Sequence, residues 1–216
     1  MKKKNRRLCF SLCALAIFIF WTVVVRYVDV DTIGPQGSRV GFATLNASFY
    51  ALTGVHMSLY TITDWLGLVP VAVAFGYAVT GLVQLLRRKS LFRVDSNILA
   101  LGVFYLVVMC IFVFFEAVVI NYRPVLISGV LEASYPSSTT MLVMCVMPTA
   151  AMLLRSYIKN NVFRQCVVLG MDLFVAFMVI GRLLAGVHWV TDIVGGALLS
   201  TGLVRMYRFV CALEEK

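Results

Sequence analysis

Three ionisable residues lie close together in an otherwise apolar part of the chain, namely Arg182, His188 and Asp192. Five residues separate Arg182 from His188, and Asp192 follows His188 by about one helical turn. Burying such groups at membrane depth is unfavourable, so ionisable residues in an apolar segment are candidates for function. On one helix, a spacing of four puts His188 and Asp192 on the same face, where the carboxylate can fix the imidazole tautomer. This arrangement predicts that His188 acts as a nucleophile.

A phosphate group is the partner that the remaining polar residues favour. Arg123, which precedes a proline, and Arg182 both carry a guanidinium whose forked donors fit phosphate oxygens. Ser137 and Ser138 follow Pro136 at the expected start of a helix, where free backbone amides attract an anion. The sequence therefore predicts a phosphate cradle. The six cysteines lie singly without a nearby histidine, which disfavours a metal site or disulfides.

The composition indicates an integral membrane protein. Of the 216 residues 61% are apolar and 13% are charged, and the mean hydropathy is +0.93. Soluble domains carry about 25% charged residues, and apolar runs of roughly 18 residues suffice to cross ~30 Å of hydrocarbon. The net charge of +9 comes from Lys and Arg beside the apolar runs, so it predicts membrane topology rather than nucleic-acid binding. One membrane-embedded domain over residues 1–216 is expected.

The predicted fold class is all-α, a bundle of six transmembrane helices with an interfacial segment between the first two. The expected spans are 8–25, 66–86, 98–120, 139–154, 166–184 and 189–207. The segment 26–65 contains spaced apolar residues and predicts a loop followed by an interfacial or re-entrant helix. Asp64, just before the second span, is interpreted as a helix cap.

The distribution of basic residues predicts the orientation. Successive loops between six spans lie on alternate sides of the membrane. Fifteen of the nineteen Lys and Arg then fall on the side of the amino terminus, and the remaining four, Arg26, Arg39, Arg123 and Arg182, fall on the other side. The positive-inside rule then places both termini in the cytoplasm and the candidate site on the extracytoplasmic side. The compact size and short cytoplasmic loops suit a bacterial cell membrane.

The polar residues resemble the signature motifs of a known family. Arg-Pro at 123–124, Pro-Ser at 136–137, and Arg182 with five residues to His188 and three more to Asp192 resemble the three motifs of the type 2 phosphatidic acid phosphatase family. The resemblance covers roughly residues 116–192. It implies a metal-independent, cofactor-free phosphatase or phosphotransferase that acts on lipid phosphates or diphosphates through a phosphohistidine. It assigns phosphate binding to Arg123 and Arg182, a hydrogen bond to phosphate to Ser137, nucleophilic attack to His188 and the orientation of His188 to Asp192.

The chain departs from this family pattern at four positions. Glu116 stands where the family usually has a lysine, and Gly181 stands where the third motif usually opens with serine. Ser138 and Thr139 replace the Gly and His of the usual second motif, whose histidine protonates the leaving oxygen. The missing histidine removes the usual general acid.

Two active mechanisms are compatible with that loss. If the leaving group is itself a phosphate, its pKa of about 7, against roughly 16 for an alkoxide, means that it requires much less protonation, and Thr139 suffices. Alternatively Glu116, about two turns before Arg123 on the same helix face, supplies the proton. A structural ion pair of Glu116 with Arg123 or Arg182 is the third interpretation.

The sequence thus predicts a membrane lipid phosphatase. Undecaprenyl diphosphate, phosphatidylglycerol phosphate and phosphatidic acid are the expected types of substrate, and the lipid bilayer is the expected surrounding. A lipid phosphotransferase of the same family is the alternative enzyme. A non-catalytic protein that binds lipid phosphate is the alternative outside the enzymes, although a binder needs the arginines but not the pair of His188 and Asp192.

Overall fold

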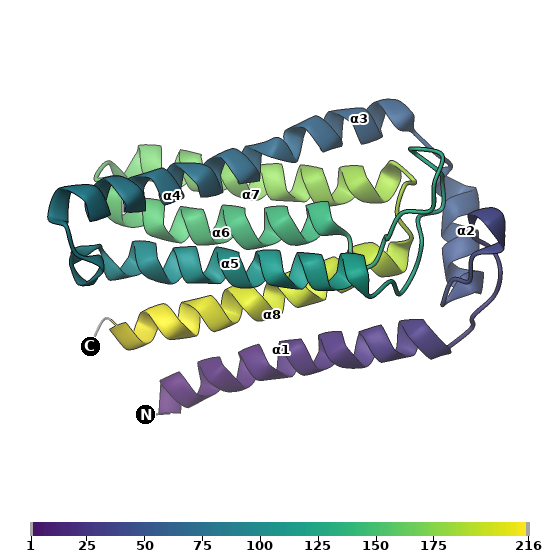
Figure 1. Ribbon diagram of the computed structural model, residues 1–216, viewed down its shortest axis with the longest axis horizontal. Coiled ribbons are helices and arrows are strands. Elements are labelled where there is room, and N and C mark those ends of the chain that lie inside the picture. Colours follow the sequence, from purple (N-terminus) through teal and green to yellow (C-terminus); the bar gives the residue numbers. More distant parts are fainter. Residues whose placement is uncertain (1, 215–216) are drawn as a thin grey trace.

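The computed structural model describes residues 2–214, whose long helices run along one common axis (Figure 1). The helices are α1 (Lys2–Tyr27), α2 (Ala43–Thr53), α3 (Met57–Leu66), α4 (Leu68–Arg88), α5 (Ser96–Ala117), α6 (Ser138–Tyr157), α7 (Asn161–Leu184) and α8 (Val190–Glu214). Both chain ends lie at one end of the bundle, the terminal end, and α2 lies at the opposite end, the site end. Met1, Glu215 and Lys216 lie outside the described residues, and Lys216 is one of the basic residues used to predict the orientation.

The predicted all-α fold and its six spans are confirmed. In residues 2–214 the helices long and apolar enough to cross a membrane are Asn5–Tyr27, Met57–Arg88, Ser96–Ala117, Ser138–Arg155, Asn161–Leu184 and Val190–Cys211. The third span ends at Ala117, earlier than the predicted residue 120, because the chain leaves the helix to form the connection to α6. The second starts earlier than predicted, because α3 continues into α4 through Gly67, whose backbone stays in the right-handed helical region.

The segment between the first two spans contains the helix α2. Figure 1 shows α2 lying across the site end, at a steep angle to the long helices, as predicted for an interfacial element. The side chain of Asn46 in α2 is buried, and its Nδ2 donates hydrogen bonds to the Gly41 carbonyl (2.8 Å) and to Thr191 Oγ1 in α8 (3.0 Å). These contacts fix α2 against the beginning of α8, beside the candidate site.

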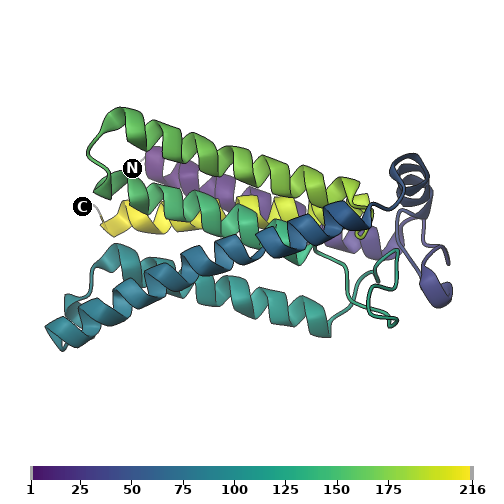
Figure 2. The same ribbon diagram turned by 90° about the horizontal axis from the view of Figure 1, so that it is seen from above.

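The core of the bundle lies around α6 and α8, the two most buried of the six spans. Residues from several helices pack there, among them Leu101, Cys145, Leu199 and Leu203. In Figure 2, α4 crosses the bundle obliquely and α5 lies along one flank, apart from α7. Large apolar side chains such as Phe20 and Leu173 face outward, as expected where the surrounding solvent is lipid. Helices satisfy their own backbone hydrogen bonds, which is the condition for crossing hydrocarbon.

Candidate active site

The connection between α7 and α8 carries the three residues that the sequence singles out. Arg182 lies in the last turn of α7, His188 in the connection and Asp192 in the first turn of α8. Gly186 has a positive φ of 70°, and a Cβ there would lie 2.1 Å from the Gly54 carbonyl oxygen. Glycine thus meets both the backbone conformation and the close approach that this turn requires.

The prediction that His188 and Asp192 share a helix is wrong. The helix begins at Val190, so His188 precedes it and the spacing of four does not put the two side chains on one helical face. The carboxylate instead turns back toward the helix start, where Asp192 Oδ2 accepts the Trp189 N–H at 3.0 Å. A side-chain acceptor for a free amide of the first turn is a common feature of helix starts.

A short antiparallel pairing in the connection between α5 and α6 brings further side chains to the site. Tyr122 pairs with Ala133, the Arg123 N–H donates to the Glu132 carbonyl at 3.0 Å, and the Ser134 N–H donates to the Asn121 carbonyl at 2.9 Å. Side chains alternate across such a ladder, so Asn121, Arg123, Glu132 and Ser134 lie on the face opposite Tyr122 and Ala133. One ladder therefore presents four polar side chains to the site.

Ser134 stands between His188 and Asp192. Its Oγ lies 2.9 Å from His188 Nδ1 and donates to Asp192 Oδ2 at 2.5 Å. Asn121 Nδ2 donates to the other carboxylate oxygen, Asp192 Oδ1, at 3.1 Å. Among the described residues no hydrogen bond joins His188 to Asp192 directly. The buried carboxylate thus accepts three donors, and its link to the imidazole runs through a serine hydroxyl.

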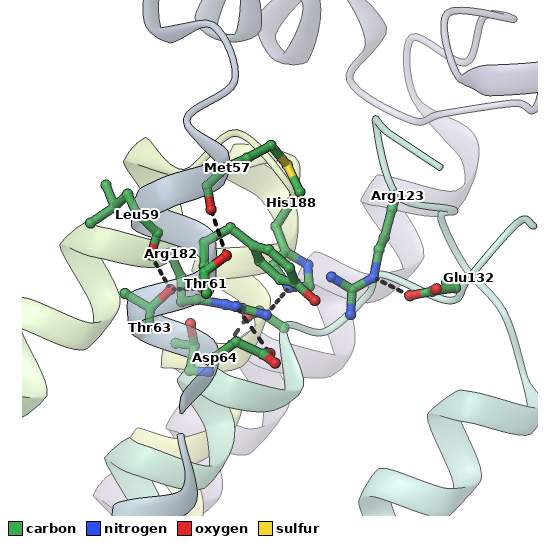
Figure 3. Close-up of polar contacts among 12 residues, drawn as sticks. Met57, Leu59, Thr61, Thr63, Asp64, Arg123, Glu132, Arg182 and His188 are labelled. Atoms are coloured by element: carbon green, nitrogen blue, oxygen red, sulfur yellow. Dashed lines mark hydrogen bonds and ion pairs between the residues drawn. The ribbon is translucent and has the colours of Figure 1, made fainter. Parts of the chain in front are cut away.

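Two arginines converge on the opposite edge of the imidazole (Figure 3). Arg182 is 1% exposed, and its Nη2 lies 3.4 Å from His188 Nε2, while its Nη1 lies 3.6 Å from Asp64 Oδ1. Arg123 forms an ion pair with Glu132 through Nε at 3.2 Å, and in Figure 3 its guanidinium points toward His188 and Arg182. Asp64 lies inside α3 and contacts Arg182, so its interpretation as the cap of the second span is wrong.

Several donors of these arginines are left without a hydrogen-bond partner. Arg123 Nη1, Arg182 Nε and Arg182 Nη1 are buried and have no hydrogen-bond partner among the described residues. An unsatisfied buried donor is unfavourable by about 1–3 kcal/mol, and more when it is charged. Two adjacent guanidiniums with free donors form a site for an anion with several oxygens, for which phosphate is a good match.

The start of α6 has the local structure that its sequence predicts. Ser137 is the N-cap, its Oγ accepts the Thr140 N–H, and its own N–H donates to the Asp192 carbonyl at 3.0 Å. Ser138 and Thr139 follow in the first turn, and both are partly exposed. The amide of Ser137 is therefore engaged in fixing α6 to α8, while the first-turn amides of Ser138 and Thr139 point out of the helix start.

Glu116 lies apart from both arginines. Their acidic partners are Glu132 for Arg123 and Asp64 for Arg182, and the described residues contain no ion pair between Glu116 and either of them. Glu116 instead lines a small pocket together with Ser134, Tyr135 and Ser138. The structure therefore does not contain the ion pair that was one interpretation of this acid.

The electrostatic surroundings keep His188 neutral. Burial, followed by the positive charges of Arg123 and Arg182, holds the pKa of His188 well below its ordinary value of 6.5, although the contact with Ser134 acts in the opposite direction. A neutral imidazole retains a lone pair, which a nucleophile needs. Among the described residues no cluster of three or more His, Cys, Asp or Glu is arranged to hold a metal ion.

Comparison with known proteins gives the family of this site. The sequence profile of the PAP2 superfamily matches residues 116–211, which include every polar side chain just described except Asp64. Residues 116–211, somewhat less than half of the chain, are thus similar to the PAP2 superfamily. A similar solved structure is the crystal structure of a transmembrane PAP2-type phosphatidylglycerolphosphate phosphatase from Bacillus subtilis, with a TM-score of 0.53 and 18% identity, covering 92% of this chain and 94% of that chain. That likeness shows the PAP2 fold with its membrane-spanning helices. No curated protein sequence matches the chain.

Proposed function

We propose that this protein is a membrane lipid phosphatase whose nucleophile is Nε2 of His188. The observation that carries the proposal is the pair of buried guanidiniums, Arg123 and Arg182, with unpartnered donors beside a neutral imidazole. Phosphate oxygens would satisfy those donors and bring phosphorus to the edge of His188. The match to the PAP2 superfamily supports phosphatase activity of this class.

The reaction follows from these positions in two steps. His188 Nε2 attacks the terminal phosphorus, the bond from that phosphorus to the leaving oxygen breaks, and the electron pair leaves with that oxygen. The leaving oxygen belongs to the lipid alcohol in a monophosphate and to the remaining lipid phosphate in a diphosphate. Water then attacks phosphorus, the bond to Nε2 breaks and its electron pair returns to the ring. One proton of the water stays on the inorganic phosphate and the other passes to solvent. Arg123 and Arg182 stabilise the charge on the transferred group in both steps, and the hydrogen-bonded carboxylate of Asp192 stabilises the positive imidazole of the intermediate.

The lipid part of the substrate fits an apolar cavity that starts beside the site. This cavity of about 320 Å³ lies between α4, α5 and α6, with Ser138 and Thr139 in its lining. Its apolar walls come from Val71, Ala74, Val108, Phe112, Leu142 and Val146. It shares Phe112, Ser138 and Met141 with the small pocket that Ser134 and Glu116 line. A hydrocarbon chain in this cavity would hold its phosphate near the start of α6.

The side chains at the site favour a substrate whose leaving group needs little protonation. Thr139 occupies the position of the usual general acid, and Glu116 contacts neither arginine in the described structure. We therefore favour a lipid diphosphate, such as undecaprenyl diphosphate, over phosphatidic acid, because a phosphate leaves without full protonation. In the alternative mechanism Glu116 donates the proton, and Glu116→Gln should then abolish turnover of a monophosphate ester alone.

The proposed orientation puts the site outside the cytoplasm. Basic side chains gather at the terminal end of the bundle, among them Arg87, Arg88, Arg93 and Arg208. The positive-inside rule assigns that end to the cytoplasm, and the site end then faces the opposite side of the cell membrane. The compact size of the protein and its short cytoplasmic loops favour a bacterial cell.

A phosphate-release assay tests the proposed function. The purified protein in detergent is given phosphatidic acid, phosphatidylglycerol phosphate or undecaprenyl diphosphate, and His188→Ala serves as the blank. The matched control is His56→Gln, because His56 is the only other histidine, is exposed and contacts the Thr53 carbonyl. Release that depends on His188 and not on His56 is expected. Equal release by the His188→Ala variant would exclude the proposed nucleophile, and binding without release would favour a non-catalytic protein.

An acceptor assay separates the hydrolase from the phosphotransferase alternative. Reactions in labelled water report whether the oxygen of the released phosphate comes from water. Incorporation of labelled oxygen in each turnover is expected of the hydrolase. Loss of substrate without inorganic phosphate, with a phosphorylated alcohol as the product, would show a transferase.

A further inference from the structure

A serine hydroxyl separates the imidazole of His188 from the carboxylate of Asp192, and we propose that Ser134 is the positioning residue that fixes the tautomer of His188. The distances are 2.9 Å from Ser134 Oγ to His188 Nδ1 and 2.5 Å from Ser134 Oγ to Asp192 Oδ2. The proposed function assigns His188 and Asp192 to catalysis and leaves Ser134 without a role. The inference rests on that function for its catalytic consequence, but the tautomer itself can be measured without turnover.

The direction of each hydrogen bond follows from the chemistry of the groups. An ionised carboxylate only accepts, so the hydroxyl hydrogen of Ser134 points to Asp192 Oδ2. The oxygen of Ser134 then has only lone pairs left for His188, so Nδ1 of the imidazole carries the hydrogen and donates it. Starting from Asp192, the geometry therefore puts the proton on Nδ1 and leaves Nε2 with a lone pair.

The other edge of the ring gives the same tautomer independently. Arg182 Nη2 lies 3.4 Å from His188 Nε2, and a guanidinium has no acceptor to offer. A hydrogen on Nε2 would put two donors face to face, which is unfavourable. A lone pair on Nε2 can instead accept from the Arg182 Nη2–H. Both neighbours of the ring thus favour the tautomer whose free lone pair points toward the two arginines.

The loop structure holds Ser134 in this position. Its side chain is buried, and its N–H donates to the carbonyl of Asn121, the residue whose side chain holds the other oxygen of Asp192. Asp192 is further held by the Trp189 N–H. With three donors on the carboxylate, the hydroxyl of Ser134 is the group through which the negative charge of Asp192 acts on the ring.

The catalytic consequence concerns the phosphorylated intermediate. When Nε2 bonds to phosphorus, the ring becomes positive and its Nδ1–H becomes a stronger donor. Ser134 Oγ accepts this bond while its own hydrogen stays on the side of Asp192, so no proton has to move. Removing the hydroxyl should lower kcat roughly tenfold to hundredfold, the range for losing a charge-assisted hydrogen bond.

Nitrogen NMR of histidine-labelled protein tests the tautomer directly. The chain has two histidines, so His56→Gln leaves His188 as the source of the ring signals. Since the pKa of His188 lies well below 6.5, the ring is neutral at pH 7 and shows its tautomer. We expect a protonated Nδ1 and an unprotonated Nε2 in this background. We expect Ser134→Ala to weaken that preference, because only the longer contact with Arg182 then favours it. We expect Ser134→Thr, which keeps the hydroxyl, to retain it.

Asn121→Ala is the matched control, because Asn121 holds the same carboxylate but does not contact His188. This variant should lower activity and leave the tautomer unchanged. A protonated Nε2 in the His56→Gln background would overturn the inference, even if Ser134→Ala failed to fold. An undiminished preference in Ser134→Ala, or a loss of preference in Asn121→Ala equal to that in Ser134→Ala, would also overturn it. The expected spectra in a protein without phosphatase activity would leave the tautomer inference standing and refute the proposed function.

Discussion

Replacing Asp192 by asparagine tests how the buried carboxylate supports the site. Asp192 Oδ2 accepts from the Ser134 hydroxyl and the Trp189 N–H, and Oδ1 accepts from Asn121 Nδ2 at 3.1 Å. In Asp192→Asn the amide oxygen can take the place of Oδ2 and accept from the Ser134 hydroxyl and the Trp189 N–H. The new NH₂ group then faces the NH₂ group of Asn121, so a buried donor meets a donor.

Two effects of different size follow from this geometry. An unsatisfied buried donor should lower the free energy of unfolding by about 1–3 kcal/mol. The loss of the negative charge weakens the hydrogen bond that Ser134 Oγ accepts from the positive ring of the intermediate, an effect of about 1.5–3 kcal/mol on the barrier. At about 1.4 kcal/mol for each factor of ten, kcat should fall roughly tenfold to hundredfold.

The assay combines phosphate release with thermal unfolding monitored by circular dichroism, with rates taken well below the unfolding temperature of every variant. Asp172→Asn is the matched control, because Asp172 also lies in a spanning helix but lines a groove with Arg155 and Arg164, away from His188. The double variant Asn121→Asp, Asp192→Asn exchanges the two side chains, so that the amide at 192 donates to the carboxylate at 121. It should recover most of the lost stability while kcat stays at least about tenfold below wild type. A kcat of Asp192→Asn within twofold of wild type would refute the reasoning.

Three further changes should have measurable effects. Arg182→Lys keeps the charge but loses the forked donors, so kcat/KM should fall roughly tenfold to hundredfold in the phosphate-release assay, and an unchanged value would contradict the role of the guanidinium. Glu132→Gln removes the acid that competes with phosphate for Arg123, so inorganic phosphate should inhibit severalfold more strongly, and weaker inhibition would argue against this competition. Because the pKa of His188 is depressed in the folded protein, the unfolded chain binds the proton more readily, and the free energy of unfolding should fall as the pH drops below 6.5. The variant His188→Gln should lack this part of the slope, and an identical slope would contradict the depressed pKa.

Composition and spacing predict the bundle and the proximity of its key residues. Long apolar runs identify the six spans because hydrocarbon requires helices with satisfied backbones. The segment from Arg182 to Asp192 connects two successive spans, and a short connection between spans keeps its residues at the same end of the bundle. The ends of the spans are less predictable, because the apolar sequence of the third run continues past Ala117 although the helix does not.

The residues that surround this segment depend on tertiary structure. Ser134 and Asn121 reach Asp192 only because residues 121–123 pair with residues 132–134, and neither stretch has the length or apolar alternation that indicates a strand. Asp64 reaches Arg182 because α3 packs beside α7, a contact between distant segments. A weak signal existed for Ser134, which lies three residues before Ser137 at the predicted phosphate site.

Chemical trapping of the intermediate tests the central claim most directly. Protein mixed with a lipid labelled in the transferred phosphate is quenched within the first turnover, and the labelled residue is identified by peptide mass spectrometry. We predict phosphate on His188, stable in base and lost in acid, and absent from His188→Ala. Label on another residue, or no covalent label during active turnover, would contradict the account.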